Sequence, residues 1–105
     1  MSAMTMADFD AAVAARQPLP ASAPPLVRAL WHDAIGDWAR AHTLAQDVES
    51  PEGAWVHAYL HRKEGDIGNA HYWYRRAGRP PAMDTLDDER RVIVMALLGE
   101  SNASA

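Results

Sequence analysis

Histidine is the residue type in this sequence whose number and spacing best suit chemistry, with five among 105 residues. His57 and His61 are four residues apart, so in a helix they share one face, and Glu64 continues along it. Two imidazoles at this spacing can chelate one zinc ion, and a carboxylate can supply a third ligand. These three residues, with His32 or His71 as a further ligand, form a candidate site for zinc or another divalent metal.

Other kinds of catalytic site find little support in the sequence. A zinc protease needs a glutamate directly after the first histidine of its motif, because that glutamate activates the metal-bound water. Ala58 follows His57 here, so this mechanism is not supported. The chain has no cysteine nucleophile and no glycine-rich phosphate loop. We therefore expect binding rather than catalysis, with no catalytic residue and no cofactor other than the alternative metal.

Start and stop signals of helices place these residues in a helical chain. Ser50-Pro51-Glu52 supplies a capping hydroxyl, a proline at the first helical position and an acid near the positive helix end. Gly36-Asp37 and Gly65-Asp66 each supply a stop followed by a cap. Because β-branched residues are few and no long segment alternates, we predict an all-α fold.

The length of the chain indicates a single domain, residues 1–105. Four prolines within residues 17–25 separate the N-terminal segment from the rest of the chain, and Pro80-Pro81 precedes the last helix. The predicted parts are an N-terminal helix within 1–16, a proline-rich linker at 17–25, a first helix-turn-helix hairpin at 26–48, a second at 50–78 and a C-terminal helix at 85–98.

Residues 29–48 match residues 58–77 without gaps, which indicates an internal repeat. Six of the twenty aligned positions are identical, and they include the turn and the small residues. One such hairpin cannot bury its apolar face alone, so we expect the two to stack. The identical pairs are Ala29 and Ala58, His32 and His61, Gly36 and Gly65, Asp37 and Asp66, Ala41 and Ala70, and His42 and His71.

The second unit carries a family resemblance. Gly65-Asp66-Ile67, followed by Ala70, Tyr74 and Ala77, resembles the second half of a tetratricopeptide repeat, and residues 70–77 are similar to the Ala-x-x-Trp-Tyr-x-x-Ala segment of Sel-like repeats. The resemblance covers residues 25–80 and implies two stacked helical hairpins that act in protein interaction or scaffolding. The spacing of 29 departs from the tetratricopeptide period of about 34.

Other departures concern individual positions and the number of units. Ala54 and His57 stand where that family has an early tryptophan and leucine, and two units are fewer than the usual minimum of roughly three. The run 57–77 also resembles a small family of uncharacterised proteins, which adds no activity.

An aromatic and arginine stripe is the candidate binding surface of such a module. Trp55, Tyr59 and Arg62 follow helical spacing, and a surface of this composition is typical of interaction hot spots. In the repeat register the stripe lines a groove for a peptide or protein partner. The alternative is that the C-terminal helix folds back and fills the groove. The groove continues through Leu26, Leu30 and Asp33.

The repeat register also gives the histidines a structural alternative. His61 and His71 fall at positions that helical repeats normally fill with apolar or aromatic side chains, so they are expected to be hydrogen-bonded core residues. If each hairpin closes in the usual way, His32 approaches His42 and His61 approaches His71 across the two hairpin interfaces. Because burial lowers the pKa of a histidine, the stability of such a core should fall as the pH drops through about 6.5.

Charge and hydropathy restrict the partners. The net charge of −4 does not favour a phosphate backbone, and three arginines among residues 75–79 suit the end of a helix better than a nucleic-acid patch. No apolar run is long enough to span a membrane, and no secretory signal is visible. We expect a cytoplasmic protein that binds neither nucleic acid nor membrane. Apolar end faces left by a two-unit array would favour a homodimer.

Overall fold

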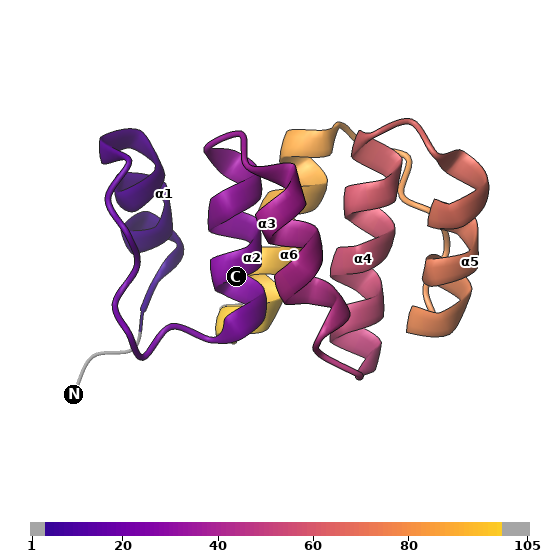
Figure 1. Cartoon of the computed structure of the whole chain (residues 1–105), viewed down its shortest axis with the longest axis horizontal. Helices are drawn as coiled ribbons and strands as arrows, with labels where there is room; N and C mark the ends of the chain where they lie inside the picture. Colours follow the sequence, from indigo (N-terminus) through magenta and orange to yellow (C-terminus); the bar gives the residue numbers. More distant parts are fainter. Residues whose placement is uncertain (1–3, 100–105) are drawn as a thin grey trace, which may run out of the picture.

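The structure, a computed structural model, describes residues 4–99, which form six helices and no strand. The all-α prediction is confirmed. Residues 1–3 and 100–105, which the predicted domain includes, lie outside the described part. None of the described helices has the length and apolar character to cross a bilayer. The helices are α1 (Met6–Ala15), α2 (Pro25–Ala34), α3 (Trp38–Gln46), α4 (Pro51–Lys63), α5 (Ile67–Ala77) and α6 (Leu86–Leu98), as shown in Figure 1.

The predicted caps and turns determine where the central helices begin and end. The Ser50 side chain accepts a hydrogen bond from the Gly53 amide at the start of α4. Asp37 and Asp66 cap α3 and α5 in the same way, through the amide three residues ahead. Gly36 and Gly65 precede these two caps with φ of 96° and 87°, a left-handed conformation that only glycine adopts without strain.

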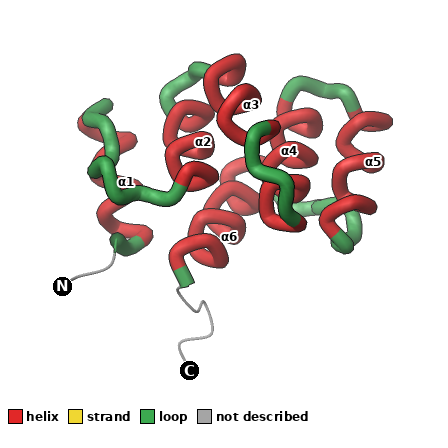
Figure 2. Tube along the Cα trace, turned by 60° about the horizontal axis from the view of Figure 1, so that its bottom comes forward, coloured by secondary structure: helices red, strands yellow, loops and turns green. Residues whose placement is uncertain are grey.

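Helices α2, α3, α4 and α5 lie side by side in chain order, each packed against the next (Figure 1). After α5, Gly78 takes a left-handed conformation and Pro80-Pro81 prevents the helix from continuing. The chain then turns back, and α6 crosses the array to pack mainly against α4, α2 and α1 (Figure 2). It also contacts α5 through the hydrogen bond from the Tyr74 hydroxyl to Glu89.

The alanines that the repeat duplicates lie where helices meet. Ala29, Ala41, Ala58 and Ala70 are at most 1% exposed, so their small side chains let the helix axes approach closely. Larger apolar side chains from α2, α4 and α6 fill the space around them and bring the three helices into one core. The fully buried members of this core are Val27, Leu30, Val56, Tyr59, Leu60, Ile93 and Val94.

Candidate functional site

Three imidazoles converge between α3 and α4. His57 and His61 project from one face of α4, as their spacing predicts, and their rings stack with centroids 4.9 Å apart. His42 enters from α3 and places its Nε2 2.9 Å from the Nε2 of His57. A ligand nitrogen from each of the three rings lies within 4.8 Å of the others. We call His42, His57 and His61 the histidine cluster.

Two tryptophans hold the cluster in place. Trp38 stacks on His42 with ring centroids 4.9 Å apart and an interplanar angle of 14°. Trp73, from α5, stacks on His57 at 3.9 Å and 16°. The indole of Trp38 is itself fixed, because its Nε1 donates a 2.8 Å hydrogen bond to the carbonyl of Leu60. The imidazoles are therefore oriented by packing before any ligand arrives.

Burial favours the neutral form of two of these imidazoles, His57 and His42. It lowers the pKa of His57 from 6.5 to about 4, and the nearby rings of His42 and His61 add to the shift by repelling a second positive charge. Burial also lowers the pKa of His42. A neutral imidazole retains the lone pair that a metal ion needs, so His42 and His57 can bind an ion at neutral pH without first losing a proton.

Glu64 binds the outer side of the cluster. Its Oε1 lies 2.6 Å from His61 Nδ1, and this contact leaves the Nε2 of His61 for another partner. In metal sites, a carboxylate on the second ring nitrogen orients the ligating imidazole and increases its basicity. The predicted ligand Glu64 thus has the geometry of a positioning group. Asp66 is also close to this pair, but its carboxylate caps α5.

The other predicted metal ligands lie elsewhere. His71 is exposed on α5, and His32 packs edge-on against Trp31 on α2. The expected pairing of histidines across each hairpin is therefore wrong: His42 contacts His57 and His61 instead. The reason is that α3 packs against α4, so the side of α3 that carries His42 faces the second helix pair rather than α2. His42 was named in the repeat but not in the predicted metal site.

The predicted groove residues are covered in this structure. Leu26, Leu30, Trp55 and Tyr59 are at most 6% exposed, and α6 packs against both helices that carry them. Polar contacts fasten α6 there: Asp33 lies 3.9 Å from an Arg90 nitrogen, and Arg62 donates a 2.9 Å hydrogen bond to Glu89. Partner binding through these residues stays a prediction, and it would require α6 to move away.

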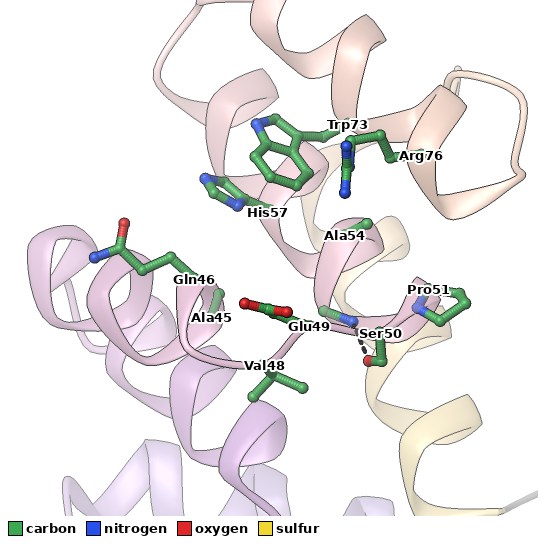
Figure 3. Close-up of a pocket in the computed structure, with 11 residues that line it drawn as sticks. Ala45, Gln46, Val48, Glu49, Ser50, Pro51, Ala54, His57, Trp73 and Arg76 are labelled. Atoms are coloured by element: carbon green, nitrogen blue, oxygen red, sulfur yellow. Dashed lines mark hydrogen bonds between the residues drawn. The ribbon is translucent and has the colours of Figure 1, made fainter.

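A cleft of about 580 Å³ opens beside the histidine cluster (Figure 3). It is bounded by the end of α3, the link to α4, the first turns of α4 and one side of α5. His57 and Trp73 form its aromatic wall, and Glu49 and Arg76 are charged residues at its sides. Sequence reasoning missed this cleft, because its residues come from three helices with no common spacing.

Comparison of the chain with protein-family models, with curated proteins and with solved structures gives no match. The function is therefore inferred from this chain's own residues. The resemblance of residues 25–80 to tetratricopeptide and Sel-like repeats stays a prediction.

Proposed function

We propose that this protein binds a divalent transition-metal ion through His42, His57 and His61. The observation that supports this most is the convergence of three oriented imidazoles from two helices, with ligand nitrogens within 4.8 Å of one another. A tetrahedral zinc site with Zn–N bonds of 2.0–2.1 Å has its nitrogens about 3.3 Å apart. The 2.9 Å between His42 and His57 therefore needs to widen by only a few tenths of an ångström.

The protons of the cluster are compatible with this proposal. The hydrogen bond between His42 Nε2 and His57 Nε2 requires one of them to carry a proton. For both rings to bind an ion through Nε2, the donor ring must take its other tautomer, in which the single proton of the neutral imidazole is on Nδ1, so no net proton is lost. Glu64 already favours this tautomer for His61 by accepting from Nδ1. A set of imidazoles alone suits zinc, copper, nickel or cobalt rather than magnesium or calcium.

We infer that the scaffold that holds the cluster consists of two degenerate tetratricopeptide or Sel-like hairpins, α2–α3 and α4–α5. The duplicated Gly-Asp turns and the buried alanines support this reading. It gives the site a physical basis, because histidines on α3 and α4 meet only when the first helix pair packs against the second. Metal binding is better supported than partner binding, since α6 covers the predicted groove.

Titration of untagged protein with Co²⁺ tests the proposal directly. We expect one equivalent to bind, to produce the visible absorption of tetrahedral cobalt and to quench tryptophan fluorescence, because Trp38 and Trp73 stack on cluster rings. Zinc at about 100 times its Kd should stabilise the folded state by about 2.7 kcal/mol. His42→Ala and His57→Ala should each abolish the absorption band.

The matched control is His71→Ala, which removes an exposed histidine from α5 and should leave cobalt binding unchanged. Circular dichroism of each variant shows whether it is folded. A folded wild-type protein that binds no Co²⁺ or Zn²⁺ at about 100 µM would contradict the proposal. So would undiminished binding by the His42→Ala and His57→Ala variants.

A further inference from the structure

The cleft beside the histidine cluster has the size and the walls of a ligand site. Its volume of about 580 Å³ falls within the range of about 300–1,000 Å³ that small-molecule sites occupy. The Trp73 indole, stacked on His57, provides a flat apolar wall. Ala45 and Ala54 add small side chains that leave the space open (Figure 3).

Opposite charges stand at two sides of this cleft without neutralising each other. Figure 3 shows the guanidinium of Arg76 on the α5 side and the carboxylate of Glu49 on the side of the link between α3 and α4. Within residues 4–99, neither takes part in an ion pair. The Arg76 guanidinium lies 5.4 Å from the Trp73 ring centroid and 5.8 Å from that of Tyr72, and its Nη1 donates a 3.3 Å hydrogen bond to the Tyr72 hydroxyl.

We propose that this cleft binds a short zwitterionic peptide of two or three residues, with its carboxylate on Arg76 and its ammonium group on Glu49. Arginine binds a carboxylate through two parallel hydrogen bonds, and a glutamate oxygen accepts from an ammonium group. Because Arg76 and Glu49 do not pair with each other, an occupant with charges at separated ends can contact both. The middle of the peptide lies against Trp73. The cleft shares His57 with the proposed metal site, but the contacts to Arg76 and Glu49 do not require the ion.

Isothermal titration of metal-free protein with trialanine tests the proposal. We expect saturable binding, weakened about tenfold by Glu49→Gln and about tenfold by Arg76→Gln. The matched controls are Glu52→Gln and Arg75→Gln, which remove exposed charges of the same sign that do not line the cleft and should leave the affinity unchanged.

Blocked peptides assign each end to its partner. N-acetyl-trialanine lacks the ammonium group, so Glu49→Gln should no longer weaken its binding, whereas Arg76→Gln still should. Trialanine amide lacks the carboxylate and should show the opposite pattern. Absence of wild-type binding at about 10 mM trialanine would overturn the proposal. Equal sensitivity of the free and blocked peptides to both variants would overturn it as well. Because metal is absent throughout, these results do not depend on the metal site.

Discussion

The protein buries two kinds of polar cluster, and they differ in how completely the chain itself satisfies them. Asp33 is 1% exposed, and its carboxylate accepts from the Tyr59 hydroxyl at 2.7 Å and from Lys63 Nζ at 2.8 Å. Glu89 is 2% exposed and accepts from the Tyr74 hydroxyl at 2.5 Å and from Arg62 at 2.9 Å. We call these the two carboxylate clusters.

The carboxylate clusters are complete without any ligand. Burial raises the pKa of both Tyr59 and Tyr74, so the phenols stay protonated as donors, and each carboxylate has a cationic neighbour. Glu89 belongs to α6, and Asp33 lies near Arg90 of the same helix. These pairs fix the position of α6. Each buried carboxylate already has a hydroxyl and a cationic side chain as partners, so neither needs a ligand.

The histidine cluster, in contrast, is not fully satisfied by side chains of the protein itself. Its walls are aromatic, and its rings make one hydrogen bond to each other and one to Glu64. Within residues 4–99 no lysine or arginine forms an ion pair with it, and the burial of His57 and His42 favours neutral rings with a lone pair available. The difference teaches that burial alone does not mark a functional site: the clusters with every partner present hold the fold, and the cluster with free ligating capacity is the candidate for binding.

The largest expected effect comes from breaking a carboxylate cluster. Asp33→Ala leaves the Tyr59 hydroxyl buried without an acceptor and removes the partner of Lys63. Loss of one member of a buried ion pair costs about 4 kcal/mol, so the free energy of unfolding should fall by that order. Urea denaturation followed by circular dichroism measures it.

The control is Asp87→Ala, which breaks an exposed contact to Arg90 within α6 and should cost far less. If the two variants unfold at the same urea concentration, the carboxylate clusters do not hold α6 as we infer.

The next effect is the response of the metal-free histidine cluster to acid. The pKa of His57 is about 4 in the folded state and 6.5 in the unfolded state, so the unfolded state binds the proton more tightly. The contribution of His57 to stability is therefore complete above pH 6.5 and is lost as the pH falls towards 4. It amounts to about 3 kcal/mol, with His42, His61 and Glu64 as the titratable neighbours.

Thermal unfolding in the presence of a chelator, recorded between pH 7.5 and 4.5, measures this loss. His57→Phe keeps a ring against Trp73 but cannot take up a proton, so its melting temperature should fall less with pH. His71→Ala, an exposed change, should follow the wild-type curve. A wild-type melting temperature that stays constant over this range would show that the fold does not hold His57 neutral.

The smallest of the three expected effects is the loss of a single hydroxyl group from a carboxylate cluster. Tyr59→Phe keeps the buried ring and removes the donor to Asp33, which retains Lys63 as a partner. A hydrogen bond to a charged group contributes about 2 kcal/mol, so the unfolding free energy should fall by about that amount. Tyr72→Phe, on an exposed tyrosine, is the comparison and should change little. If Tyr59→Phe leaves the free energy of unfolding unchanged, Lys63 alone is a sufficient hydrogen-bond partner for Asp33.

Much of the helical framework was predictable from local sequence. Ser50, Asp37 and Asp66 cap the helices that their positions predicted, and Gly36 and Gly65 end helices in the left-handed conformation. Such signals can be read without the fold, because a cap satisfies amides within a few residues of itself. The pairing of His57 with His61 on one helix face is local in the same sense.

The environment of each duplicated residue was not predictable in this way. His42 and His71 are equivalent in the repeat, yet His42 is half-buried in the histidine cluster and His71 is exposed on the last helix of the array. The same holds for Glu89, whose buried partners Tyr74 and Arg62 come from other helices. A repeat specifies the face of a helix, but not whether another helix covers it.

The sequence by itself determined the helices, their turns and the presence of closely spaced histidines, because these depend on contacts within a few residues. Only the tertiary structure decided which histidines meet. Packing of α3 against α4 brings His42 to His57 and His61, and the return of α6 across α2 and α4 covers the predicted groove. Both outcomes depend on long-range burial of apolar surface, which is the sum of many weak contacts and has no short sequence signature.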